Sequence, residues 1–472
     1  MTMVKVLLQY LSTSSLLCLA GGLVAFIYFL TSSEKSICSL SPGPPPLPLI
    51  RNLNVVDLKK PFQSLMEAVV LAGYENIKDA LLNHAEEFGE RPSVTELWKT
   101  MRRFTLSTLR DFGVGKKTIE VRILEELNFI INYFESHQGK PFDVKVILNS
   151  AVSNVICSIL FGERFQYEDP IFLTLLKLLN ENSKLLGSPM MQQFGLYNYI
   201  ISLGFLFGAP KTVLRNVDEL NAFLEKFFKE HRQEFNENNL TGFVDAFLMK
   251  QQQESRNSHT HFHNENLLFS TLDLFAACTE TISTTVRWGL LMMMKYPEIQ
   301  RRIQEEIDQV IEPGQMPMLE DRKKLPYTDA VIHEIQRFSN IVPMSVSCST
   351  STNVSFRGYM IPNGIEVIPL LTSVLKDKLH WETPDQFNPS HFLDADGSFT
   401  RKEAFIPFSI GRRVCAGEGL AKMELFLFFA GLLRKFIFQP HPGVAKADLD
   451  LTADVGFTLN PMPHLICAVP RE

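Results

Sequence analysis

The sequence predicts a mainly α-helical protein with small β-sheets, preceded by an N-terminal transmembrane helix. Three observations lead to this fold class. Long segments with apolar residues at helical spacing fill most of the chain after residue 96. Short β-type runs are confined to residues 344–370 and to the C-terminal tail, and an uncharged apolar run lies near the start of the chain.

The apolar run covers residues 6–30, which contain no charged side chain. At about 1.5 Å per residue, a helix of this length crosses a hydrocarbon core of roughly 30 Å. A cleaved signal peptide is the alternative, because Lys5 gives a positive start and Ala20-Gly21-Gly22 offers small residues. The run is longer than the about 7–15 residues of a signal core, which favours an anchor.

A proline-rich segment follows. Five of the eight residues from Ser41 to Pro48 are proline, which prevents a helix and favours a stiff extended strut. We therefore expect an anchor over residues 1–32, a hinge over residues 33–50 and one catalytic domain over residues 51–472, since no later linker divides it. The basic residues around the run favour a cytoplasmic position for this domain; they are Lys5 on one side and Lys35, Arg51, Lys59 and Lys60 on the other.

Composition excludes several classes of protein. The net charge of −6 gives no sign of nucleic-acid binding, which requires a strongly basic face. The seven cysteines are scattered and never spaced as CxxC, so neither a disulfide framework nor a zinc site is indicated. His259, His261 and His263 alternate within the polar connector 251–265; solvated histidines are the expected state, and a metal site is the alternative.

The periodic segments predict eight main helices. The expected ranges are 97–110, 117–136, 143–160, 211–235, 267–294, 297–311, 325–338 and 418–436. The helix over 267–294 is apolar except in its middle, where residues 278–281 read Cys-Thr-Glu-Thr. Strands are expected at 344–347, 354–360 and 365–370, with a β-rich tail after the last helix.

One cysteine lies in a distinctive local pattern. Residues 408–417 place Cys415 between two glycines and directly before a helix, with two arginines upstream. Glycines let backbone approach a flat cofactor closely. Amide N–H groups and the positive end of the following helix are expected to lower the pKa of the thiol and hold the sulfur as an anion. Arg413 is a candidate partner for a cofactor carboxylate. A structural cysteine in a tight turn is the alternative.

This segment resembles the F-x-x-G-x-R-x-C-x-G signature of the cytochromes P-450, through Phe408, Gly411, Arg413, Cys415 and Gly417. The resemblance extends over nearly the whole chain. Residues 321–327 and 369–374 look like the second microsomal family, particularly its fish lipid-hydroxylating branch. The resemblance implies the haem-thiolate fold and haem b as cofactor. It makes Cys415 the iron ligand and the other four residues of the signature cofactor contacts.

Three further motifs follow in the order of that family. Glu334 and Arg337 match its E-x-x-R motif, and the resemblance implies a buried network completed by His391 that supports the cysteine loop. Trp98 and Arg102 match the W-x-x-x-R of the helix that reaches a haem propionate. The segment from Ala277 to Thr281 resembles A-G-x-E-T, which crosses the haem face opposite the sulfur; the resemblance makes Ala277 a cofactor contact and Glu280 and Thr281 the proton relay.

The resemblance also implies the reaction. One oxygen atom from O2 is inserted into a lipophilic substrate, such as a fatty acid, a steroid or a xenobiotic, at the endoplasmic reticulum membrane. No Rossmann or flavin fingerprint occurs in the chain, so electrons from NADPH are expected through NADPH–cytochrome reductase, with cytochrome b5 as a further partner. The candidate basic docking residues are Arg102, Arg103, Arg110, Lys116, Lys117, Lys422 and Arg434. The candidate substrate contacts are Phe275, Ala276, Val342, Pro343 and Phe457.

The chain departs from the family pattern at four places. Cys278 occupies the usual glycine position of the oxygen-side motif, and Cys348 stands where relatives often have a histidine. Segments are expected to be missing near residue 67, which would remove a first strand pair, and near residues 93–97, which would remove part of the pocket roof. A non-catalytic or unstable haem-binding variant is therefore an alternative to an active monooxygenase. A haem-thiolate isomerase is a third; the intact Glu280-Thr281 pair argues against it.

Overall fold

The computed structural model describes residues 68–89, 96–112, 117–188 and 208–471. The chain divides into two compact units. The first, which we call the sheet unit, includes the described residues 68–70, 86–89 and 348–368. The second, the helical unit, includes the described residues 71–85, 96–112, 117–188, 208–347 and 369–471.

The sheet unit contains a three-stranded sheet and a two-stranded hairpin. Strand β5 (Glu366–Pro369) lies between β1 (Ala68–Leu71) and β2 (Cys348–Ser349), and Cys348 pairs with Val367. Strands β3 (Val354–Phe356) and β4 (Tyr359–Ile361) form a hairpin. Its two turn residues, Arg357 and Gly358, both have positive φ, as a tight hairpin requires. The ring of Phe356 packs edge-on against that of Phe88, with centroids 5.0 Å apart.

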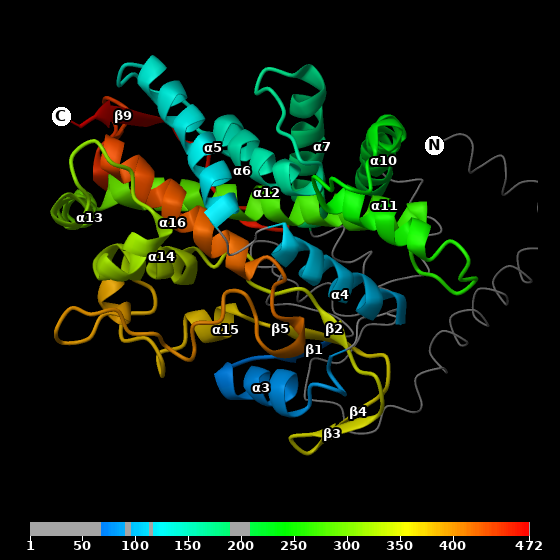
Figure 1. Ribbon diagram of the computed structural model, residues 1–472. Helices are drawn as coiled ribbons and strands as arrows, with labels where there is room; N and C mark the ends of the chain where they lie inside the picture. The colour runs from blue at the N-terminus through cyan, green and yellow to red at the C-terminus, as the bar shows by residue number, and fades with distance from the viewer. Residues whose placement is uncertain (1–67, 90–95, 113–116, 189–207, 472) are drawn as a thin grey trace, which may run out of the picture. The chain divides into compact units, whose positions relative to one another are not determined.

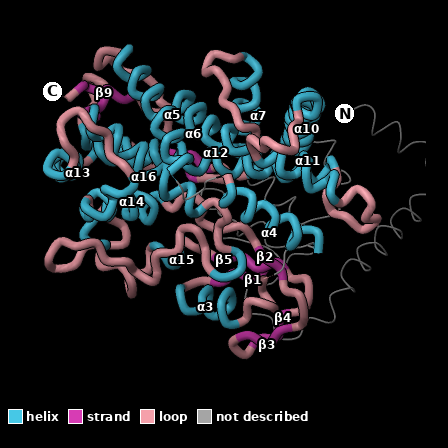
Figure 2. The backbone as a smooth tube through the Cα atoms, in the orientation of Figure 1, coloured by secondary structure: helices cyan, strands magenta, loops and turns pink. Residues whose placement is uncertain are grey.

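The helical unit is built from long helices, with a long, mostly irregular stretch between α15 and α16 (Figures 1 and 2). Its longer helices are α4 (Glu96–Asp111), α5 (Lys117–Ser136), α6 (Lys145–Leu160), α7 (Pro170–Leu186), α10 (Gly208–Glu234), α11 (Phe243–Gln253), α12 (Asn264–Lys295), α13 (Pro297–Val310), α14 (Pro326–Ser339) and α16 (Glu418–Lys435). The short ones are α3 (Tyr74–Lys78), η3 (Asp79–Asn83), η4 (Leu319–Lys324), α15 (Thr372–Leu375), η5 (Pro389–Phe392), η6 (Gly411–Arg413) and η7 (Lys446–Asp448). Two antiparallel strand pairs complete it, β6 (Phe436–Pro440) with β9 (Ile466–Pro470) and the hairpin of β7 (Ala453–Val455) with β8 (Leu459–Pro461).

Helix α12 forms the centre of the helical unit and packs against α6, α14 and α16 (Figure 1). From Ile282 to Met294 every residue is buried, which is the mark of a helix surrounded by protein on all sides. Gly289 permits this packing, because a Cβ atom there would lie 2.9 Å from the ring of Phe429 on α16. The first half of α12 differs, since Phe269, Asp273 and Ala277 are exposed at four-residue spacing.

The eight predicted helices are confirmed with small shifts at their ends. The strand expected over 344–347 is wrong: Ser345 has φ 54°, which breaks an extended run, and the strand begins at Cys348. The polar connector is shorter than expected, because α11 continues to Gln253 and α12 begins at Asn264. Helix α7 was not predicted, although Asp169 caps its first turn by accepting from the amides of Ile171 and Phe172.

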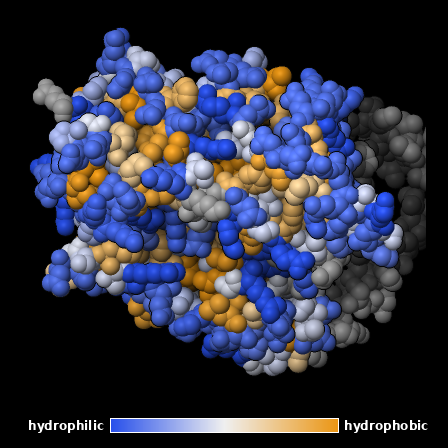
Figure 3. Space-filling view, viewed as in Figure 1, coloured by the Kyte–Doolittle hydropathy of each residue, from blue (hydrophilic) through white to orange (hydrophobic). Residues whose placement is uncertain are grey.

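The predicted anchor (1–32) and hinge (33–50) lie outside the described residues, and the two predicted gaps adjoin the same undescribed segments at 1–67 and 90–95. Within the described ranges, no helix combines the length and the apolarity needed to cross a bilayer. The same ranges contain no group of three or more His, Cys, Asp or Glu arranged to hold a metal ion, the histidine triplet at 259–263 included. The face in Figure 3 is mainly hydrophilic, with apolar residues scattered over it.

Candidate active site

The loop that carries Cys415 is tightly constrained. The Cys415 amide donates to the carbonyl of Phe408 at 2.9 Å, which closes residues 408–415 into a ring. Gly411 has φ 73°, and a Cβ atom there would lie 2.1 Å from the carbonyl oxygen of Leu81 on η3. Only glycine satisfies both conditions. The structure therefore explains the first glycine of the motif as a backbone requirement.

Backbone amides at the start of α16 hold the sulfur of Cys415. The residue is exposed, and the amides of Gly417 and Glu418, at the start of α16, donate to its Sγ. Burial raises the pKa of the Cys415 thiol, and the two amides together with Arg102 lower it without reversing the rise. The amides lower the pKa as expected, but the net pKa is raised because desolvation outweighs them, so the expected anionic sulfur is not obtained from these amides. Coordination to a metal ion would deprotonate the thiol.

Arg102 connects α4 to this loop. Its Nη2 donates to the carbonyl oxygen of Val414 at 2.7 Å. Trp98 lies on the same helix one turn earlier, but its side chain is outside the described residues. Arg413 is buried. A Cβ atom added at Gly417 would lie 3.9 Å from the sulfur of Cys415, which is ordinary van der Waals contact. The structure thus brings Arg102, Arg413 and Gly417 to the cysteine loop.

Helix α12 comes close to the cysteine loop at Cys278. Burial raises the pKa of Cys278, with smaller contributions from Glu424 and from Cys415 itself, so the two cysteines are electrostatic neighbours. Ala277, next to Cys278, is exposed on a helix whose second half is completely buried. A cysteine thiol close to a helix segment with small residues, Ala277 and Cys278, suits a flat cofactor. These residues fit haem, which Cys415 would ligate while Arg102 and Arg413 lie beside the loop as partners for its carboxylates.

The two predicted relay residues have different partners. Thr281 donates from Oγ1 to the carbonyl oxygen of Ala277 at 2.8 Å, one turn back on α12. Oε1 of Glu280 instead accepts from Thr458 and from Asn460, both at 3.0 Å. Thr458 and Asn460 belong to the β7–β8 segment and were missed at the sequence level, since no local pattern connects positions 180 residues apart.

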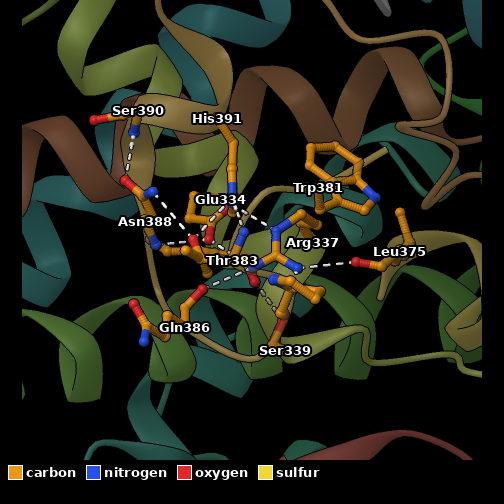
Figure 4. Close-up of polar contacts among 12 residues, drawn as sticks. Glu334, Arg337, Ser339, Leu375, Trp381, Thr383, Gln386, Asn388, Ser390 and His391 are labelled. Carbon is orange, nitrogen blue, oxygen red and sulfur yellow. Dashed lines mark hydrogen bonds and ion pairs between the residues drawn. The ribbon is translucent and has the colours of Figure 1, made fainter. Parts of the chain in front are cut away.

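The E-x-x-R network is confirmed (Figure 4). Arg337 makes a two-pronged pair with Glu334, with both N–O distances 2.7 Å, and both side chains are completely buried. Its guanidinium also donates to three backbone carbonyls, those of Leu375, Pro384 and Gln386. These contacts hold the chain between α15 and η5 against α14.

His391 completes the network, as expected. The Thr383 amide donates to its Nε2, which leaves the Nδ1 proton to face Oε2 of Glu334 at 3.2 Å. Phe392 then packs against Phe405, with ring centroids 5.0 Å apart and three residues before the start of the cysteine loop. This edge-on contact between the two rings links the buried network to the loop.

The candidate substrate and docking residues are only partly gathered. Phe275 is buried and lines an apolar cavity between α6, α7, α10 and α12, whereas Phe457 is 47% exposed at the tip between β7 and β8. Among the basic residues, Arg103, Arg110 and Lys117 are exposed. Lys422 is paired with Glu418, and Arg434 with Asp308, so these two charges are partly neutralised. Lys116 is outside the described residues.

The comparison with known families agrees with this geometry. The family model described as cytochrome P450 matches residues 62–468. The chain belongs to the cytochrome P450 family. The matched range contains every residue assigned above to the site.

Three P450 relatives illustrate the match. The chain is similar to cytochrome P450 2K4 of Oncorhynchus mykiss, with 46% identity over 507 aligned positions that cover 100% of each chain. Cytochrome P450 2K6 of Danio rerio is 45% identical over 90% of each chain. Cytochrome P450 2B2 of Rattus norvegicus is 40% identical over 97% of this chain and 99% of its own. The resemblance to the second P450 family and to its fish members is confirmed.

The alignment also bears on the missing segments. The alignment with cytochrome P450 2K4 extends over 507 positions although the chain has 472 residues, so that relative has a few dozen residues without a counterpart here. The chain is nevertheless a monooxygenase by family, with haem b as cofactor and NADPH as the electron source through a reductase. The comparisons give no support to a non-catalytic variant.

Proposed function

We propose that this P450 oxygenates a lipophilic small molecule, of the fatty acid, steroid or xenobiotic class, at the endoplasmic reticulum membrane. The reaction converts the substrate R–H, O2, two electrons and two protons into R–OH and water. The single observation that supports it best is the Cys415 loop, which presents a free thiol close to Cys278 of α12. Phe275 on α12, an apolar residue at a position that matches the substrate contacts of the family, supports a lipophilic substrate.

The residues of the chain have distinct roles in this proposal. Haem, when bound, supplies oxygen binding and reduction, and a thiolate ligand favours cleavage of the O–O bond. Cys415 holds the iron, and Arg102 and Arg413 orient the cofactor from the loop side. Thr281 and Glu280 hold protons at Oγ1 and at the carboxylate, and pass them to the oxygen side of the site.

Docking and membrane attachment complete the proposal. A basic face around Arg103, Arg110 and Lys117 receives the acidic surface of a reductase, and cytochrome b5 is a second candidate for the same face. Residues 1–32 anchor the enzyme with its catalytic domain in the cytoplasm. Two glycosylation sequons test this topology, since Asn239 and Asn353 are both exposed. In cells, neither asparagine carries a glycan in this orientation; glycan on either would reverse it.

The reaction is tested by reconstitution of the full-length, haem-loaded enzyme with a microsomal reductase, NADPH and a panel of fatty acids, steroids and foreign hydrophobes. NADPH consumption, product and hydrogen peroxide are measured together. Thr281→Ala is expected to lower product about tenfold or more and to divert electrons to peroxide, whereas Thr281→Ser keeps the hydroxyl and the coupling. Haem-loaded enzyme that oxidises no member of the panel would contradict the proposed substrate class.

A further inference from the structure

The β7–β8 hairpin makes an unexpectedly polar contact with α12 beside Glu280. Asn460 contacts three side chains of the helix. Its Nδ2 donates to Oε1 of Glu280 at 3.0 Å, and its Oδ1 accepts from Thr284 Oγ1 at 2.8 Å and from Arg287 Nη1 at 3.0 Å. Thr458, which is 1% exposed, donates a second hydrogen bond to the same Oε1.

These contacts fix the orientation of the Asn460 amide. Arg287 can only donate, so the atom that faces it must be the oxygen. The amide nitrogen must then face Glu280, because the two ends of the side chain cannot exchange without breaking the bond to Arg287. Asn460 thus presents a donor to a carboxylate and an acceptor to a cation at the same time. No other uncharged side chain of this size and shape does both.

Positive charge reinforces the arrangement. Arg287 is 5% exposed, and Glu280, Asp143 and Asp454 are the charges that act on it electrostatically. At Lys145, at the start of α6, the two strongest electrostatic interactions with charged groups are those with Arg287 and Glu280. The Glu280 carboxylate is therefore held by two uncharged donors inside a group that also contains two basic side chains.

The hairpin that carries these donors is itself fixed. The Trp288 indole on α12 donates to the carbonyl of Leu459 at 2.9 Å, and the Leu459 amide donates to Ile341 at 2.8 Å. At the tip, the Phe457 amide donates to the carbonyl of Ser183 near the end of α7 at 2.8 Å. Anchored on three sides, the hairpin can define the position of a side chain that it contacts.

We propose that Asn460, assisted by Thr458, is a positioning residue for Glu280, and that it holds the carboxylate in the place from which it serves the oxygen side of the site. The inference rests on the proposed role of Glu280 in proton delivery. A displacement of about 1 Å at such a group costs up to about a hundredfold in rate. Asn460 therefore acts on the rate and on the coupling of electrons to product, and substrate affinity does not depend on it.

Asn460→Asp is the decisive variant. It keeps the size of the side chain and both acceptor contacts, to Thr284 and Arg287, but replaces the donor facing Glu280 with a second carboxylate oxygen. We expect kcat to fall about tenfold or more, with peroxide replacing product, while the substrate dissociation constant from the spectral titration stays within about twofold. Thr458→Val is expected to lower kcat and coupling in the same way. Thr458→Ser keeps the hydroxyl donor and is expected to retain the wild-type coupling. Asn239→Asp, on the surface, controls for the added charge.

A thermal unfolding cycle tests the contact without catalysis. Asn460→Asp sets two carboxylates against each other, and Glu280→Gln in the same chain restores a donor and an acceptor with their directions reversed. The unfolding temperature of the double variant is expected to be higher than the two single changes predict by addition. Its coupling of electrons to product stays low, because the acid is gone.

The outcomes separate the two hypotheses. Full coupling in Asn460→Asp, together with impaired coupling in Glu280→Gln, would overturn the positioning role and leave the relay intact. Full coupling in Glu280→Gln would overturn the role of Glu280 in the proposed function, whatever Asn460 does. Additive unfolding temperatures would show that the two side chains do not interact, and would also overturn the inference.

Discussion

Two glutamates on neighbouring helices are both 0% exposed, yet they are in opposite states of hydrogen bonding. Glu334 on α14 accepts from Arg337, from the Asn388 amide and from His391. Glu424 on α16 has neither carboxylate oxygen hydrogen-bonded within the described part of the chain, and burial raises its pKa well above the ordinary value. Equal burial therefore gives no measure of what a charged side chain contributes.

The difference shows where the protein tolerates a buried charge. A buried ion pair offsets the cost of desolvation only when its geometry is good and every remaining group is satisfied. The Glu334 network meets this condition, and it supports the segment that leads to the cysteine loop. Glu424 has neither a counter-charge nor a hydrogen-bond partner in the described chain, and its raised pKa favours the uncharged form, which lowers the cost of desolvation. The same substitution at the two positions should therefore have opposite effects.

Glu334→Gln gives the largest expected effect. The change keeps the shape of the side chain but leaves the Arg337 guanidinium buried without its counter-charge, which costs about 3–5 kcal/mol. We expect a large fall in the thermal unfolding temperature and poor retention of haem in the purified protein. A variant with the stability of the wild type would show that the network does not support the fold, and would remove the contrast.

Glu424→Gln is the matched control and gives an intermediate effect of opposite sign. Because the folded pKa is raised above 4.5, the stability from this carboxyl is fully present below pH 4.5 and is lost as the pH rises toward the folded pKa. Glutamine does not ionise, so the variant gains on the wild type by up to about 1.4 kcal/mol per pH unit above 4.5. Unfolding midpoints measured from pH 5 to pH 8 test this; parallel curves would contradict it.

His231→Gln gives the smallest effect and sharpens the comparison at a partly exposed pair. Its Nε2 lies 2.7 Å from Oδ1 of Asp245, and this hydrogen bond raises the pKa of His231 above 6.5, against the effect of burial. The stability that the protonated pair provides is complete below pH 6.5 and is lost as the pH rises through the raised pKa. The variant should show a flatter pH dependence of unfolding near neutrality; an unchanged slope would exclude the pair as its source.

Local patterns in the sequence predicted what local physics determines. The helix over 117–136 was correct at both ends because its buried face repeats at helical spacing. Glu334 and Arg337 could be paired in advance because positions three apart share a helix face. Gly411 was expected to let backbone approach a cofactor, and the close neighbour that the structure shows for it is the backbone of Leu81.

The rest depends on packing between distant segments. Nothing near residue 280 indicates that Thr458 and Asn460 bind its carboxylate, because the contact exists only after the hairpin has folded onto α12. The pKa of Cys415 was expected to fall and instead rises, because the desolvation of the thiol by neighbouring segments cannot be read from a motif. Glu424 and Glu334 differ for the same reason, since only the folded structure shows which of the two buried carboxyl groups has hydrogen-bond partners.

Ligation of haem iron by Cys415 is the central claim, and the reduced protein's carbon monoxide spectrum tests it most directly. Purified full-length protein is expected to show a Soret band strongly red-shifted from that of imidazole-ligated haem, and Cys415→Ala is expected to lose both this band and most of the bound haem. A band at the imidazole position in the wild type, or an unchanged red-shifted band in Cys415→Ala, would contradict the account.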